Sequence, residues 1–175
     1  GLSIAPNSKR PARYGLSGLP AHGRKQISRS LALLEENRRC LSFLTVSLPR
    51  EALIDLARSG RWPEFQDRVR KELIRRLRAA GLPALVVGVV ELQPKRSRAE
   101  GRPCPHWHIV FQGRRTRGSA WALSREQLDG VIAAALASAG VRAHDLRSAG
   151  NVQQVKRSVR AYLSKYMTKG SGDCA

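Results

Sequence analysis

The sequence predicts an α+β fold in which helices cover an antiparallel sheet. The chain has 175 residues and is 42% hydrophobic, which suits one globular domain with a real core. Apolar segments of strand and helix character follow one another as strand, helix, strand, strand, helix, strand, helix. This order is typical of a split βαββαβ arrangement.

The first half of the chain contains an arm, a short helix and an apolar strand, followed by two helices. Residues 1–26 are rich in Pro, Gly, Ser and basic residues and predict a basic N-terminal arm, which leaves 27–175 as the folded domain. The expected elements are a helix over 27–34, a strand over 41–48 ended by Pro49, a helix over 51–58 and a longer helix from 63. In that longer helix an apolar stripe repeats at helical spacing and Gly81 provides the cap; the stripe is Phe65, Val69, Leu73 and Leu77.

The second half supplies the remaining strands and helices. β-branched residues predict a strand over 84–92, a polar, basic loop follows over 94–103, and a second strand covers 105–112, paired with the first as a hairpin. Ser124 is the expected N-cap of a helix over 126–139 that Gly140 ends. We expect a weaker strand over 141–146 and a final helix that Asn151 caps and that runs to about Lys169.

Charge and cysteine content limit the kinds of partner and compartment. Lys and Arg number 32 against 13 Asp and Glu, a net charge of +19 spread along the chain, which favours nucleic acid as partner over a membrane surface. Cys40, Cys104 and Cys174 form no Cys-x-x-Cys pair, so neither a disulfide framework nor a zinc finger is expected, and a reducing cytoplasm is the predicted location. No apolar run is long enough to span a membrane. Since the chain begins at Gly1 and its one methionine is Met167, we expect it to be part of a longer protein.

Two histidines on the 105–112 strand form a candidate metal site. Alternation places His106 and His108 on one face and Trp107 on the other, toward the core. Glu91, near the end of the preceding strand, can reach the same face, and two imidazoles with a carboxylate suit Mn²⁺ or Mg²⁺, and also Zn²⁺ or Co²⁺. Glu100 is an alternative acidic ligand.

Other interpretations of these residues stay open. The histidines can be ordinary core or surface residues, and Glu91 can be an edge-strand carboxylate paired with an arginine. Cys104 would share the histidine face and is a weaker candidate for a fourth ligand. The remaining histidines, His22 and His144, are expected to be non-catalytic, and Trp62 and Trp121 to be packing residues unless one is exposed and stacks on a base.

The final helix carries candidate nucleophiles. Helical spacing places Tyr162, Lys165, Tyr166 and Lys169 on one side. A tyrosine hydroxyl can attack a phosphate, and a lysine one turn away can stabilise the phenolate or bind the phosphate. Ordinary amphipathic packing is the alternative.

Three strings in this order resemble the HUH endonuclease superfamily, and in particular its two-tyrosine rolling-circle replication initiators. They are Phe43-Leu44-Thr45-Val46-Ser47 on the first strand, His106-Trp107-His108 with Glu91 as acidic partner, and Tyr162-x-x-Lys165-Tyr166. Ser47 stands where a threonine is more usual. The tyrosines follow the histidines, as in replication initiators and related transposases and unlike conjugative relaxases.

The resemblance implies a fold, a reaction and a set of partners. The fold would be a ferredoxin- or RRM-like HUH core flanked by helices. The activity would be metal-dependent, site-specific nicking and rejoining of single-stranded DNA through a 5′-phosphotyrosine, initiating rolling-circle replication of a plasmid or phage. Glu91, His106 and His108 would hold the metal, Tyr162 would attack first, Lys165 would assist and Tyr166 would act in a second round. Partners would be single-stranded DNA or an origin hairpin, with a host helicase and polymerase, and neither a membrane nor a small-molecule substrate.

Basic residues outside these strings are the candidates for binding the DNA backbone. We expect this role of Arg96, Arg98, Arg114, Arg115, Arg117 and Lys169. A two-tyrosine single-strand transposase, a non-catalytic nucleic-acid-binding module and a nuclease that activates water are the alternative functions.

Overall fold

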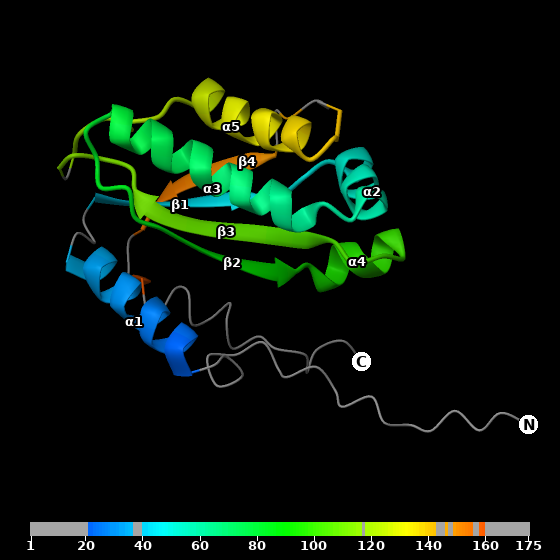
Figure 1. The fold of residues 1–175 in the computed structure, drawn as a ribbon, viewed down its shortest axis with the longest axis horizontal. Coiled ribbons are helices and arrows are strands. Elements are labelled where there is room, and N and C mark those ends of the chain that lie inside the picture. The colour runs from blue at the N-terminus through cyan, green and yellow to red at the C-terminus, as the bar shows by residue number, and fades with distance from the viewer. Residues whose placement is uncertain are drawn as a thin grey trace, which may run out of the picture.

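The computed structural model is an α+β fold with an open antiparallel sheet (Figure 1), and it describes residues 21–36, 40–116, 118–142, 146, 149–155 and 158–159. Within these residues the elements are α1 (Ala21–Glu36), β1 (Leu41–Val46), α2 (Arg50–Ser59), α3 (Trp62–Ala79), β2 (Val86–Leu92), α4 (Pro94–Glu100), β3 (Pro105–Gln112), α5 (Arg125–Ser138) and β4 (Gly150–Gln154).

The four strands lie in the order β2-β3-β1-β4, and every neighbouring pair is antiparallel. The parallel strands β1 and β2 are therefore separated by β3, and β3 and β4 are separated by β1. This arrangement is compatible with the split βαββαβ pattern that the sequence predicts. It places β1 and β3, which carry the apolar and histidine motifs, at the centre of the sheet.

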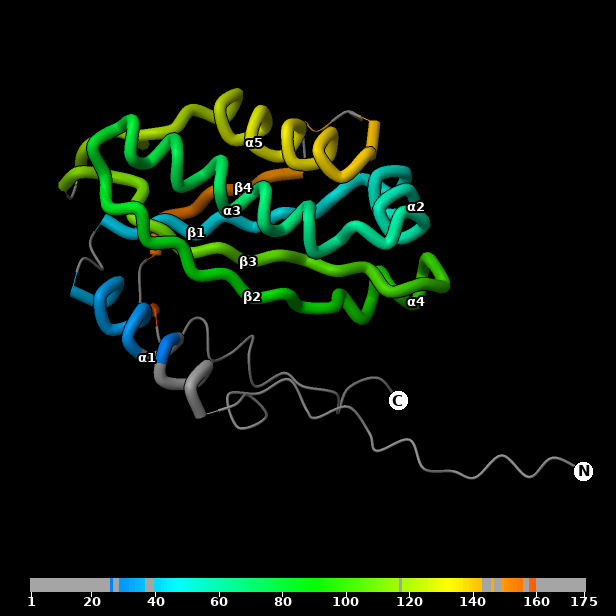
Figure 2. Tube along the Cα trace, viewed as in Figure 1, coloured from blue at the N-terminus to red at the C-terminus, as the bar shows by residue number. Residues whose placement is uncertain are grey.

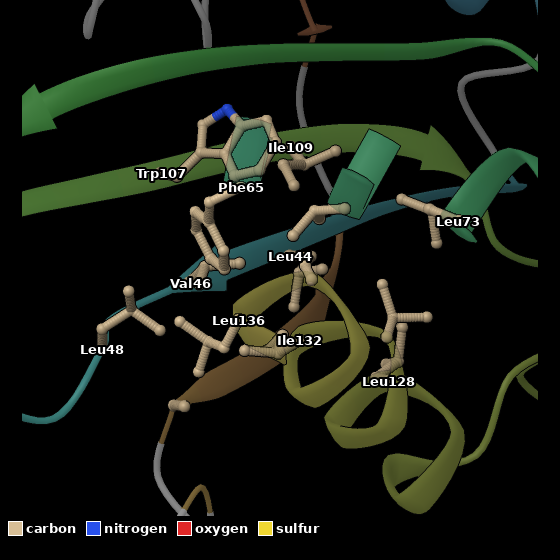
Figure 3. Close-up of a cluster of buried hydrophobic side chains, with 14 of the residues drawn as sticks. Leu44, Val46, Leu48, Phe65, Leu73, Trp107, Ile109, Leu128, Ile132 and Leu136 are labelled. Carbon is tan, nitrogen blue, oxygen red and sulfur yellow. The ribbon is translucent and has the colours of Figure 1, made fainter. Parts of the chain in front are cut away.

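One face of the sheet forms the main core under α3 and α5, which cover it from above in Figures 1 and 2. The predicted stripe of α3 is confirmed, because all four of its apolar residues are fully buried. Figure 3 shows Phe65 beside Trp107, whose ring centroids are 6.3 Å apart, above the aliphatic side chains of β1 and α5. Trp107 therefore faces the core, as the alternation of β3 predicts.

The opposite face carries a smaller apolar cluster, and α1 lies on this side of the sheet (Figure 1). Leu31 and Leu34 of α1 pack there with Phe43 and Val110 of the central strands. The helix begins at Ala21, before the predicted start at residue 27, so it crosses the expected boundary between arm and domain.

Three further helix ends agree with the sequence. The Ser124 hydroxyl accepts a hydrogen bond from the Gln127 N–H, and Gln127 Oε1 accepts one from the Ser124 N–H, which completes a capping box at α5. Gly81 and Gly140 follow α3 and α5 with φ of 68° and 73°, the left-handed conformation that glycine adopts at low cost.

The segment after β2 differs from the prediction. Residues 94–100 form the short helix α4 instead of a loop. Its ends explain the difference: Pro94 occupies the first helical turn and Gly101 ends the helix with a φ of 63°. An ion pair one turn apart, between Arg96 and Glu100, supports it.

The last strand is also displaced from its predicted place. Residues 141–146 do not form the expected strand where they are described, and β4 is Gly150–Gln154 instead. Val141 is buried because its N–H closes the end of α5 on the Leu136 carbonyl, so its apolar side chain serves a helix terminus. Asn151, the predicted helix cap, is an exposed strand residue paired with Thr45. A polar sequence is tolerated there because β4 is an edge strand.

Among the helices of the described residues, none has the length and apolar character needed to cross a membrane.

Candidate functional site

The candidate site is built by strand register at one end of the central strands. Glu91 of β2 pairs with His106 of β3, and His108 lies opposite Thr45 of β1. Directly opposed residues of antiparallel strands share a face, so these four side chains lie on the sheet face opposite Trp107. The predicted sharing of a face by Glu91, His106 and His108 is therefore confirmed by the register.

His108 is fixed from three sides and is 4% exposed. Its Nε2 lies 3.2 Å from Glu91 Oε2, and its Nδ1 lies 3.2 Å from Thr45 Oγ1. The ring stacks on Phe43 with centroids 5.1 Å apart. With Nδ1 facing a hydroxyl, Nε2 is the nitrogen directed toward the carboxylate.

His106 is half-buried beside it, with ring centroids 5.6 Å apart. Its Nε2 lies 2.9 Å from the hydroxyl of Ser47, which directly follows β1. The pKa of His106 is lowered from 6.5 to about 4, chiefly by burial and then by the neighbouring His108 and Arg96, while Glu91 opposes the shift. The imidazole is therefore neutral at physiological pH, the form that binds a metal.

These residues fit a divalent metal in chemistry and in register, but not as a finished three-ligand group. Across the described residues no three His, Cys, Asp or Glu side chains are arranged so that they could hold a metal ion. The 3.2 Å between His108 Nε2 and Glu91 Oε2 matches the separation, roughly 3.0–3.4 Å, of two ligands each about 2.1 Å from one ion. His106 departs from this arrangement because its Nε2 faces Ser47, so its ring would have to turn to become the third ligand.

Two alternative ligands are placed elsewhere. Glu100 accepts a hydrogen bond from Arg96 at 2.7 Å, whereas Glu91 is the carboxylate beside His108. The prediction that Cys104 shares the histidine face is wrong, because its side chain is fully buried in the main core with Trp107. The alternation that predicted its direction starts only where β3 starts, at Pro105.

The predicted DNA-binding arginines divide between the two ends of β3. Arg96 lies at the site, where its guanidinium contacts the Ser47 hydroxyl at 3.4 Å and the Leu48 carbonyl at 3.1 Å, and Arg98 is exposed on the same helix. Arg114 follows the other end of β3, roughly 25 Å from His106 along the strand. It stacks on the partly exposed Trp121 ring at 4.3 Å, and Arg115 donates to the Ala80 carbonyl at 3.0 Å. Arg117 lies outside the described residues.

The predicted nucleophile helix, with Tyr162, Lys165, Tyr166 and Lys169, also lies outside the described residues. His144 lies outside them too. The chain leading to it is described as far as Val159. Val159 is fully buried in the smaller cluster, with Phe43, on the histidine face. Its N–H donates to Glu35 Oε2 of α1 at 2.9 Å.

Sequence reasoning gave no individual role to Thr45 and Ser47, which contact the two histidines directly. The available signal was the alternation of side chains: Thr45 lies on β1 opposite His108, and Ser47, two residues on and just after the strand, continues the same alternation, so both hydroxyls face the imidazoles.

Comparison with known proteins adds no relative: no protein-family model, no curated protein and no solved structure matches the chain.

Proposed function

We propose that this protein nicks and rejoins single-stranded DNA through a phosphotyrosine intermediate, and that it thereby initiates rolling-circle replication. The observation that carries the proposal is the meeting of Glu91, His106 and His108 on one sheet face, with the chain that leads to Tyr162 entering on that same face. Tyr162 is three residues beyond Val159, a length of chain that spans at most about 11 Å.

In the proposed reaction, the Tyr162 hydroxyl oxygen attacks the scissile phosphorus. A new phosphorus–oxygen bond links the 5′ phosphate to tyrosine, the bond to the 3′ oxygen breaks, and that oxygen takes a proton to become a free 3′-OH. Tyrosine loses its proton in the same exchange, and Lys165 stabilises the resulting charge. The step exchanges one phosphodiester for another, so no ATP is needed. Attack of a 3′-OH on the phosphotyrosine re-forms the DNA strand and releases Tyr162, and Tyr166 attacks in a second round of cleavage.

A divalent metal, Mn²⁺ or Mg²⁺, is the proposed cofactor and would be held by Glu91, His108 and His106. When bound, it would polarise the scissile phosphate and stabilise the charge that develops there. The chain itself contributes a neutral His106, kept so by burial, and a His108 whose ring is oriented by Thr45 and Phe43. Such outer contacts are the usual means of orienting histidine ligands.

The test is a covalent adduct. Labelled single-stranded DNA is incubated with the protein and Mn²⁺ and separated under denaturing conditions, with Tyr162→Phe, Tyr166→Phe and the double variant alongside. We expect a protein–DNA band that disappears with EDTA, in His108→Ala and in the double variant. The single variants assign the first nucleophile.

Other outcomes point to different functions. Cleavage without an adduct that survives in the double variant would indicate attack by water. Binding of DNA with no cleavage of any origin-derived or hairpin oligonucleotide would favour a non-catalytic binding module. A two-tyrosine transposase shares the adduct and differs in joining the excised strand to a new target.

A further inference from the structure

Three arginines converge on Glu100 at the edge of the histidine site. Arg96 Nε lies 2.7 Å from Glu100 Oε1, and Arg50 Nε lies 4.0 Å from Oε2. Arg102 donates from Nε to the Glu100 backbone carbonyl at 3.4 Å. These residues, the Glu100 cluster, join the start of α2 to the end of α4, which lie at the same end of the sheet in Figure 1.

The cluster carries more positive charge than its own carboxylate neutralises. The guanidiniums of Arg96 and Arg50 face the Glu100 carboxylate and that of Arg102 lies on the Glu100 carbonyl, so three positive charges meet one negative charge and two remain. The exposed Lys95 and Arg98 of α4 add to them. The surrounding arginines hold the pKa of Glu100 below its ordinary value, so it remains ionised. Glu100 Oε2 is enclosed yet accepts no hydrogen bond from the part of the chain that the structure describes, and the Arg50 side chain is 59% exposed. Glu100 therefore holds Arg50 loosely enough that Arg50 can pair with another anion instead.

Short contacts link this cluster to the histidines. Arg96 contacts the Ser47 hydroxyl at 3.4 Å, and the same hydroxyl lies 2.9 Å from His106 Nε2. An anion bound by these arginines would thus lie beside the proposed scissile phosphate. Successive phosphates of a single strand are natural occupants of two such adjacent sites.

We infer that Arg50, Arg96 and Arg102 form a phosphodiester-binding site for the single strand next to the scissile position, and that Glu100 holds these arginines in place and competes with the DNA for them. The inference rests on the proposed function for its ligand, single-stranded DNA. In this arrangement α4 and the start of α2 determine which phosphate of the strand reaches the histidines.

A second glutamate provides a matched control. Glu72 on α3 is likewise surrounded by arginines, with Arg75 at 2.7 Å and Arg68 at 3.1 Å. Helix α3 covers the opposite face of the sheet, over the main core. Glu100→Gln and Glu72→Gln change the net charge equally, so a difference between them reports position and not overall charge.

The experiment measures binding of a fluorescein-labelled thymidine oligonucleotide of about 30 nucleotides by anisotropy, in EDTA, between about 50 and 200 mM NaCl. We expect Glu100→Gln to tighten binding about two- to fivefold while Glu72→Gln leaves it within error. Arg50→Gln and Arg102→Gln should each weaken binding and reduce the slope of log K against log salt by about 0.7, whereas Arg68→Gln should not. Circular dichroism confirms that each variant is folded.

Equal effects of Glu100→Gln and Glu72→Gln, or an Arg50→Gln slope equal to that of Arg68→Gln, would overturn the inference. The assay needs neither metal nor tyrosine. If the protein forms no covalent adduct but its variants bind DNA as expected here, the proposed nuclease function is refuted and the phosphodiester site is still supported.

Discussion

His106 should make the metal-free protein lose stability as the pH falls from neutrality toward 4. Its pKa is about 4 in the folded chain, against 6.5 for a free imidazole, chiefly because burial disfavours the charged form. Between these values the unfolded chain binds a proton that the folded chain does not. Stability contributed by the neutral imidazole is thus complete above pH 6.5 and is lost progressively down to about pH 4.

The magnitude follows from the same two values. Each pKa unit corresponds to about 1.4 kcal/mol, so the difference sets a ceiling of roughly 3.4 kcal/mol. Because His106 is only half-buried, solvent screening reduces the expected effect to about 1–2 kcal/mol. Urea unfolding in EDTA at pH 7 and near pH 4.5 measures it, and His106→Gln, which cannot titrate, should show a pH dependence smaller by that amount.

A direct titration provides the refutation. The His106 ring proton, followed by NMR in EDTA and assigned with the glutamine variant, should titrate below about pH 5. A midpoint of 6 or above would show that the ring is not desolvated as its position between His108 and Ser47 requires. An unchanged pH dependence of stability in His106→Gln would have the same meaning.

Two other predictions test the scaffold of the site. Thr45→Val removes the hydroxyl at His108 Nδ1 while keeping the side-chain shape. It should weaken Mn²⁺ binding, measured by calorimetry, about tenfold with little change in unfolding free energy. An unchanged Mn²⁺ affinity would contradict an orienting role for Thr45. Gly88→Ala should destabilise the fold by roughly 1–3 kcal/mol in urea unfolding, because the new Cβ would lie 2.6 Å from Trp107 Nε1. Gly130→Ala in α5 has room for its Cβ and should be neutral or stabilising by up to about 1 kcal/mol. Equal effects of the two substitutions would contradict the packing argument.

The sequence predicts the centre of this fold well because both central strands are strongly patterned. The alternation of β3 places Trp107 in the core and the histidines opposite, and the hairpin with β2 then brings Glu91 beside them. Periodicity determines which face a side chain occupies once the segment is a regular strand. It fails at Cys104, one residue before β3 starts, where the chain is not yet extended in the sheet.

Elements set by tertiary position could not be predicted in the same way. Strand β4 has the polar sequence Gly-Asn-Val-Gln-Gln, and its strand character comes from pairing with β1 at the edge of the sheet. Val141, which the sequence places in a strand, instead closes the end of α5 with its N–H. The arginines of the Glu100 cluster are separated by up to 52 positions in sequence, between Arg50 and Arg102, so only the fold brings them together.

The two faces of the sheet therefore differ in the side chains that they carry, and the central strands connect the two faces residue by residue. On β3, Trp107 and Ile109 stabilise the fold under α3 and α5, while the alternate residues His106 and His108 face the smaller cluster. We expect a packing defect on the core face to shift the histidines, because both sets of side chains share one backbone. Gly88→Ala should consequently weaken Mn²⁺ binding as well as stability, whereas a core change remote from β3 should lower stability alone.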